Sequence, residues 1–283
     1  MEEIMEQSIV VGVTESAVCR RVLEWVSVRA RERGSRIELV SVVGGALGVV
    51  GEGPLLDEAL RSANALLERE AELLRSRGVI VDTRVARGDP VGELVETSMV
   101  FDLLAIGSDH GGPAGGPRRG LHGTRIVAGA YCPVAVIPDF DLAGRHGIVV
   151  GIDRSPIARR ALGFAFEEAE RSGEPLTVLH TWQPVPLPMS MDAYPHGYLA
   201  GAQALAEETV DLALAEIAPA HPRVPVTRVV EQGAPAQQLN ELASRARLAV
   251  VGSHGKGALA RFLLGSTSQR VLEELATVTV VVR

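Results

Sequence analysis

The sequence predicts an α/β protein of two tandem doubly wound (Rossmann-like) domains, each a five-stranded parallel sheet of order 3-2-1-4-5 with helices on both faces. Two observations support this fold class. The chain contains one internal duplication of long period, and within each copy short β-branched runs alternate with segments of helical apolar spacing. Strands that alternate with helices form parallel sheets, and right-handed crossovers place the helices on both faces of each sheet.

The duplication sets the domain boundaries. Three blocks recur in the same order in both halves, so that residues 8–35, 85–98 and 103–111 match residues 147–174, 230–243 and 248–256. Between the copies, residues 138–146 have turn residues and no sustained apolar period, which is typical of a linker. We therefore expect one domain over residues 1–140 and a second over residues 147–283.

The first copy carries clear helix and strand signals. Val18, Val22 and Val26 recur at helical spacing, and Gly34 stands where a helix commonly ends. The expected strands are residues 9–13, 37–43, 80–86, 103–106 and 134–137, and the expected helices are residues 16–33, 55–77, 90–99 and 124–130.

The second copy repeats this pattern. The expected strands are residues 148–152, 176–181, 226–230, 248–251 and 278–282, and the expected helices are residues 156–172, 198–218, 235–246 and 267–275. A proline-rich loop, residues 182–196, is long enough to act as a flap.

Composition excludes several classes of protein. No run approaches the roughly 20 apolar residues of a membrane span, and the acidic N-terminus is unlike a signal or transit peptide. We therefore expect a cytoplasmic protein with no membrane partner. The net charge is −7 without a block of basic residues, which argues against nucleic acid as a partner. Cys19 and Cys132 form no CxxC motif, so we expect neither a disulfide framework nor a zinc site.

The stretch over residues 248–267, LAVVGSHGKGALARFLLGST, carries the strongest functional signal. A β-branched run ends at Gly252, a glycine-bearing loop follows, and Gly265, Ser266 and Thr267 open an amphipathic helix. A strand, a glycine loop and a helix N-terminus direct unpaired backbone N–H groups at one point, which suits a phosphate. The pattern thus indicates a nucleotide site, and the alternative is a glycine-rich connection without a ligand.

The glycine spacing distinguishes this stretch from other nucleotide motifs. Ala258 follows Lys256-Gly257, so the stretch is not a P-loop, and it also lacks the GxGxxG dinucleotide fingerprint. Two residues separate Gly252 from Gly255, and nine separate Gly255 from Gly265. This spacing resembles the ATP-binding signature of the universal stress protein family, which ends in Gly-Ser or Gly-Thr.

The resemblance covers both halves of the chain and implies roles for individual residues. It implies ATP, with Mg²⁺, as the cofactor, and backbone contact to adenine at Thr181. Its phosphate contacts fall on the Ser266 hydroxyl, with Thr267 adjacent, and on the three glycines Gly252, Gly255 and Gly265. It also implies pairing of the two domains through their last strands, which would make the chain an intramolecular pseudo-dimer and leaves a homodimer open.

Asp153 is the acidic residue expected at the same site. In an open parallel sheet the ligand binds outside the carboxyl ends of the strands where the strand order reverses, and the strands that precede Asp153 and Gly252 flank that point. An anion beside a triphosphate is unfavourable, so Asp153 should face the nucleoside end. The alternative is a turn-capping role, although capping falls more naturally to Ser155 before Pro156.

The first copy departs from the motif at three positions. Thr14 replaces Asp153, His110 replaces Gly255, and Leu121 replaces Ser266. A β-carbon at His110 obstructs the approach of backbone to phosphate, and Leu121 removes a hydroxyl. We expect the site of the first domain to be empty or weaker than that of the second.

Three functions remain open at this point. The first is an ATP-responsive binding module, for which the resemblance implies a regulatory role in stress and an unknown protein partner. The second is an enzyme of the same fold that uses or slowly hydrolyses ATP, although no nucleophile, metal cluster or acid–base pair marks dedicated catalysis in the sequence. The third is a dimerisation scaffold that needs no nucleotide.

Overall fold

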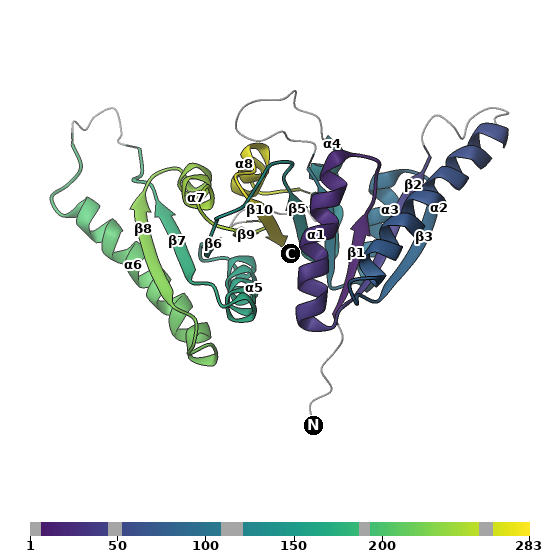
Figure 1. Cartoon of the computed structure of the whole chain (residues 1–283). Helices are drawn as coiled ribbons and strands as arrows, with labels where there is room; N and C mark the ends of the chain where they lie inside the picture. The colour runs from purple at the N-terminus through teal and green to yellow at the C-terminus, as the bar shows by residue number, and fades with distance from the viewer. Residues whose placement is uncertain (1–6, 45–52, 109–120, 187–192, 255–262) are drawn as a thin grey trace. The chain divides into compact units, whose positions relative to one another are not determined.

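Each half of the chain folds as a parallel sheet covered by helices on both faces (Figure 1). The computed structural model describes residues 7–44, 53–108, 121–186, 193–254 and 263–283. The chain divides into two compact units, Met1–Phe140 and Asp141–Arg283. Each unit is described by itself below.

The first unit has the predicted strand order. Its strands β1 (Ser8–Gly12), β2 (Arg36–Val43), β3 (Val81–Arg87), β4 (Leu103–Gly107) and β5 (Val134–Ile137) are parallel and lie in the order β3-β2-β1-β4-β5. Its helices are α1 (Ala17–Arg33), α2 (Gly53–Arg75), α3 (Pro90–Thr97) and α4 (Leu121–Gly129), and a 3₁₀ turn (Ser98–Val100) follows α3.

The second unit repeats this topology. Its parallel strands β6 (Ile148–Gly151), β7 (Leu176–Trp182), β8 (Val226–Gln232), β9 (Leu248–Gly252) and β10 (Val278–Val282) lie in the order β8-β7-β6-β9-β10. Its helices are α5 (Pro156–Ser172), α6 (Tyr198–Ile217), α7 (Pro235–Ala243) and α8 (Ser266–Glu274), and a 3₁₀ turn (Ala218–Ala220) follows α6. The predicted fold class and strand order are therefore confirmed in both units.

Helices cover both faces of each sheet because the crossovers are right-handed. Crossovers that run toward one edge of the sheet place their helices on one face, and crossovers that run toward the other edge place theirs on the opposite face. In the second unit α5 and α6 contact each other over one face, and α7 and α8 contact each other over the opposite face. The central strands are consequently buried on both sides, as in the run Val149–Val150 of β6, which is at most 1% exposed. No helix in the described part of the chain combines the length and apolar content needed to span a bilayer.

Each helix begins and ends within three residues of its predicted boundary. The predicted stop at Gly34 is confirmed, and both Gly34 and its counterpart Gly173 adopt the left-handed conformation, with φ of 67° and 66°. In contrast, α2 begins at Gly53 rather than residue 55, α4 at Leu121 rather than residue 124, and α8 at Ser266 rather than residue 267. The first turn of a helix carries little of the apolar period, so periodicity places these starts too late.

A part-buried carboxylate, that of Glu174, holds the chain just before the first strand of the second unit. Glu174 accepts hydrogen bonds from the Gly147 amide at 2.6 Å and from Arg247 Nη1 at 3.0 Å. Burial raises the pKa of the Glu174 carboxyl, but the Gly147 amide and the Arg247 guanidinium lower it by more, so the net pKa lies below its ordinary value. The first unit uses Asp102 for the same purpose, since its carboxylate accepts from the Ser8 amide at 2.8 Å.

We predict that Glu174 makes the stability of the second unit depend on pH. Because its pKa is lowered in the folded protein, its contribution is complete above the unfolded pKa of about 4.3 and is lost as pH falls through the folded value. Glu174→Gln should lower the free energy of unfolding at pH 7 and flatten its decline below about pH 4.3. Urea unfolding followed by fluorescence of Trp182, in a Trp25→Phe background, measures this in the second unit. The exposed Glu241→Gln is the control, and an equal effect in both variants would contradict the assignment.

Candidate functional site

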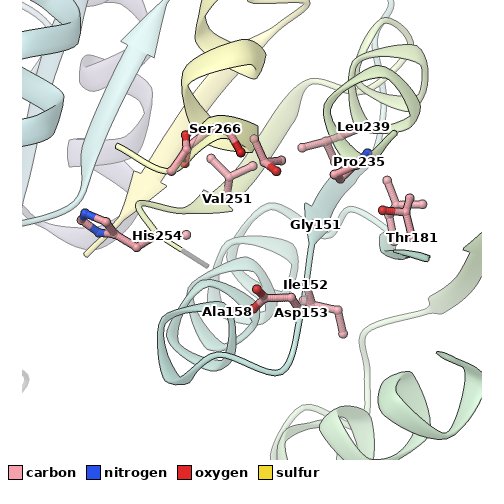
Figure 2. Close-up of a pocket in the computed structure, with 15 residues that line it drawn as sticks. Gly151, Ile152, Asp153, Ala158, Thr181, Pro235, Leu239, Val251, His254 and Ser266 are labelled. Carbon is pink, nitrogen blue, oxygen red and sulfur yellow. Dashed lines mark hydrogen bonds between the residues drawn. The ribbon is translucent and has the colours of Figure 1, made fainter. Parts of the chain in front are cut away.

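The strand order of the second unit reverses between β6 and β9. These two strands are parallel neighbours, with Val150 opposite Val250, and their crossovers pass to opposite faces of the sheet. The carboxyl ends of β6 and β9 are therefore left uncovered, which is where open α/β sheets bind ligands. A cavity of about 450 Å³ lies at this point (Figure 2).

Six of the seven residues that the sequence assigned to the site line this one cavity: Asp153, Thr181, Gly252, Gly265, Ser266 and Thr267. The seventh, Gly255, lies outside the described residues. The six come from the ends of β6, β7 and β9 and from the start of α8. Segments more than a hundred residues apart in the sequence thus meet at the cavity.

Asp153 shapes the turn after β6 and also lines the cavity. Its Oδ1 accepts a hydrogen bond from the Ser155 amide at 2.8 Å, which shapes the turn after β6. Its Oδ2 accepts none from any residue that the structure describes, and the side chain is part-exposed at the cavity. Ser155 caps α5, as predicted, because its Oγ accepts from the Ala158 amide at 3.1 Å. One carboxylate oxygen is therefore committed to the turn and the other is available to a ligand.

Thr181 presents its backbone to the cavity. The pairing of β6 with β7 ends where Gly151 lies opposite Leu179, whereas β7 continues to Trp182. The Ile152 amide donates to the Leu179 carbonyl at 2.9 Å. Alternate residues of a strand direct their backbone groups to the same side, so Thr181 turns its N–H and C=O to this side beyond the end of β6.

The start of α8 is fastened to the end of β9. The Gly265 amide donates to the Ser253 carbonyl at 2.8 Å, and the Oγ of the buried Ser268 donates to the same carbonyl at 3.1 Å. The first amide groups of a helix have no intrahelical acceptor and carry partial positive charge. Within the described helix α8 no acidic residue lies in the first turn to neutralise that charge. This end of the cavity therefore favours an anion.

Gly252 allows a close approach between β9 and α5. A β-carbon built at Gly252 would lie 2.7 Å from Ile157 Cγ2, a distance that real β-carbons do not show. The first unit repeats the contact, since a β-carbon at Gly107 would lie 2.4 Å from Val18 Cγ1. In both units a glycine at this position lets the helix pack against the strand end.

His254 follows the same strand and has one unused ring nitrogen. Its Nδ1 lies 3.0 Å from the Ser253 Oγ, whereas its Nε2 is buried and has no hydrogen-bond partner among the residues that the structure describes. Figure 2 shows the ring directed away from Asp153 and Thr181. His254 therefore lines the cavity with the base of its side chain.

An apolar wall completes the cavity and was not predicted from the sequence. It consists of Ile152, Ala158, Leu179, Pro235, Leu239 and Val251. Pro235 and Leu239 lie on one face of α7 (Figure 2). Their spacing of four residues is the signal that could have found them, because it places both on the side of the helix that meets the end of β6.

The corresponding edge of the first unit has different chemistry. Thr14, the counterpart of Asp153, shares a hydrogen bond of 2.8 Å with the Ser16 Oγ, and it offers no carboxylate. Helix α4 begins at Leu121, the position that corresponds to Ser266. His110, the third departure from the motif, lies outside the described residues.

Comparison with known proteins gives a consistent result over both units. The family model described as the universal stress protein family matches residues 5–138 and again residues 144–283. A universal stress protein of Mycolicibacterium smegmatis is 30% identical over 100% of this chain and 99% of its own length. One of Mycobacterium tuberculosis is 30% identical over 97% of this chain and 96% of its own length. The crystal structure of a universal stress protein from Archaeoglobus fulgidus covers 99% of this chain and 97% of its own, with a TM-score of 0.75 and 20% identity, and shows the same fold.

The two helix caps at the start of α1 and α5 provide a matched pair of substitutions. Ser155→Ala removes the acceptor of the Ala158 amide, and we expect it to lower the free energy of unfolding of the second unit by about 1 kcal/mol. Ser16→Ala should cost the first unit less, because the Ser16 side chain caps no backbone amide of α1. Urea unfolding followed through Trp182 and Trp25, one in each unit, measures the two values. Equal losses would contradict the difference between the caps.

Proposed function

Because this chain belongs to the universal stress protein family, we propose that its second unit is a binding module for an adenine nucleotide, namely ATP with Mg²⁺. One observation carries the proposal. The carboxylate of Asp153, the backbone of Thr181, the glycine-bearing end of β9 and the start of α8 line a single cavity of about 450 Å³. Gly252 and Gly265, two of the three glycines whose spacing resembles the family's ATP-binding signature, line the anion-favouring side of that cavity.

The phosphates fit the side formed by Gly252, Gly265, Ser266 and Thr267. The amide groups at the start of α8 donate to phosphate oxygens, and the hydroxyl groups of Ser266 and Thr267 add donors at the same place. Gly252 and Gly265 add no side chain there. This side of the cavity supplies the charge complementarity that a triphosphate requires.

The nucleoside fits the opposite side. Pro235, which is exposed, offers an apolar surface to the flat base, and the buried Leu179 and Leu239 add to the apolar lining. The Thr181 backbone can exchange hydrogen bonds with the edge of adenine, and the free Oδ2 of Asp153 can accept one from a ribose hydroxyl. Asp153 and Thr181 both lie away from Ser266 in Figure 2, so the carboxylate does not oppose the phosphates.

Mg²⁺ would enter together with the phosphates. Among the described residues no group of three His, Cys, Asp or Glu side chains could hold a metal ion, and Asp153 is the single carboxylate among those that line the cavity. Mg²⁺ retains several waters and is commonly held by substrate phosphates with few protein ligands. The donor set is therefore compatible with a metal ion carried by the nucleotide.

A route from the site to the surface begins at the end of β7. Trp182, next to Thr181, donates from Nε1 to Gln203 of α6 at 2.6 Å. In the proline-rich loop that follows, the Val185 carbonyl accepts from the Tyr194 hydroxyl at 2.9 Å, and the Val185 amide donates to the Tyr198 hydroxyl at 3.1 Å. Nucleotide contact at Thr181 would therefore act on the strand end from which this loop departs, which is the basis for a regulatory role.

Isothermal calorimetry with MgATP tests the proposal. We predict one ATP per chain for the wild type and binding weakened by about tenfold or more in Asp153→Asn. The amide oxygen of asparagine still accepts from the Ser155 amide, so this variant keeps the turn and removes the charge. Absence of binding in the wild type would overturn the proposal and favour the scaffold. A phosphate-release assay on the same samples identifies an ATP-hydrolysing enzyme.

The matched glycines separate the two units. Gly252→Ala and Gly107→Ala introduce equivalent overlaps with Ile157 and Val18, and each should destabilise its own unit by about 1–3 kcal/mol. Only Gly252→Ala should weaken ATP binding, because only the second unit has the carboxylate and the Gly-Ser start of its helix. Thermal unfolding and calorimetry of both variants measure this difference. An equal loss of ATP affinity in Gly107→Ala would place a nucleotide in the first unit.

A further inference from the structure

A second feature of interest lies on the outer surface of the first unit, along α3. We call it the α3 patch and define it by the residues Asp89, Glu93, Glu96, Met99, Val100 and Tyr131. All of these except Val100 line one surface hollow of about 490 Å³, together with Gly92 and Val95. Glu93 and Glu96 lie three residues apart on one face of α3, Asp89 is the residue that caps the helix, and Met99 lies in the 3₁₀ turn that follows it.

Three apolar side chains of the patch are exposed to solvent. Met99 is 59% exposed, Val100 78% and Tyr131 42%. A scattered apolar residue on a surface is ordinary, but Met99 and Tyr131 line one hollow and Val100 directly follows Met99 in the chain, which marks a contact surface. Their positions are fixed by the buried Ser98, whose Oγ accepts from the Tyr131 amide at 2.9 Å and donates to the Val95 carbonyl at 2.6 Å. These two hydrogen bonds join the 3₁₀ turn that carries Met99 to Tyr131 and to α3.

Carboxylates border these apolar side chains. Asp89 accepts from the Gly92 amide at 3.0 Å and so caps α3, while Glu93 and Glu96 follow on the next turns. In the part of the chain that the structure describes, none of the three forms an ion pair, whereas the nearby Arg84 pairs with Glu38 of β2. The negative charges of Asp89, Glu93 and Glu96 are therefore available to pair with basic side chains of another molecule.

The second unit shows that the fold does not require this surface. At the corresponding positions it carries Ala234, Gln238, Glu241, Ser244, Arg245 and Ala276. The inward positions stay alike, since Leu94 and Leu239 are both buried. The second unit thus folds with Ser244, Arg245 and Ala276 in place of Met99, Val100 and Tyr131, so folding does not require the exposed apolar residues of the α3 patch.

We propose that the α3 patch is the docking surface for a basic amphipathic segment of a partner protein. Apolar side chains of that segment would cover Met99, Val100 and Tyr131, and its Lys or Arg residues would pair with Glu93 and Glu96. Charge complementarity selects this partner. Nucleic acid would be repelled, and a second copy of this chain, with its net charge of −7, would bring further negative charge. The proposal is independent of the nucleotide site.

A synthetic peptide tests the surface directly in the full-length protein. The probe is a fluorescein-labelled helical peptide with leucine at alternating spacings of three and four residues and lysine at the flanking positions. Its binding is measured by fluorescence anisotropy at low and high salt. We expect Met99→Ser combined with Val100→Ser to weaken binding by about tenfold. Glu93→Gln combined with Glu96→Gln should weaken it and reduce its dependence on salt.

The duplication supplies the controls. Glu241→Gln, at the position that corresponds to Glu96, should leave peptide binding unchanged, and a peptide with glutamate in place of each lysine should not bind. Calorimetry with ATP should be unaffected by all of these substitutions, and circular dichroism checks that each variant folds. Equal binding of the lysine peptide to the wild type and to both double variants would overturn the proposal. So would a dimer in sedimentation analysis that Met99→Ser and Val100→Ser dissociate, since the patch would then join two copies of this chain.

Discussion

The reversal of strand order between β6 and β9 is the constraint on which the rest of the second unit depends. The crossovers from these neighbouring strands must pass to opposite faces, so no helix can cover both carboxyl ends. Gly252 has no β-carbon, which lets Ile157 of α5 approach the end of β9 closely. The cavity is therefore a consequence of topology, and its chemistry depends on which residues follow the two strands.

Those residues divide the cavity into two parts with opposite preferences. The start of α8 gathers amide groups and hydroxyls with no acid in the first turn of the helix, whereas Asp153 lies after β6, away from Ser266 in Figure 2. An anion is stabilised at the first and disfavoured at the second. A ligand with a charged end and a neutral end is thereby oriented before any specific contact forms, which is the property expected of a site for a nucleotide.

Much of this could be predicted from the sequence, because the signals are local and repeated. The alternation of strands and helices and the duplication were enough to give the fold class and the strand order of both units, and the end of α1 at Gly34 followed from a single residue. The glycine spacing, the position of Asp153 after a strand and the family resemblance, which implied Thr181, led to six residues that share one cavity. The sequence could not reveal that one oxygen of Asp153 is already bonded to the Ser155 amide. It also did not reveal the apolar wall, since Leu239 resembles any buried helix residue until α7 is placed against β6. The starts of α2 and α4 were missed because a first helical turn has little periodicity of its own.

The duplication explains where the two units were free to differ. Residues that face inward repeat in kind, as Leu94 and Leu239 do, because the packing of helix on sheet is the same in both. Residues at the sheet edge and on the outer helix faces carry no such requirement.

The second unit has a carboxylate and a Gly-Ser helix start at its edge, and the outer face of its α7 has small or polar residues. The first unit has Thr14 and Leu121 at its edge, and the outer face of its α3 has Met99 and Val100 exposed beside Glu93 and Glu96. Since folding demands neither set, the two units retain one framework and present different chemistry to other molecules, the second at its edge and the first along α3.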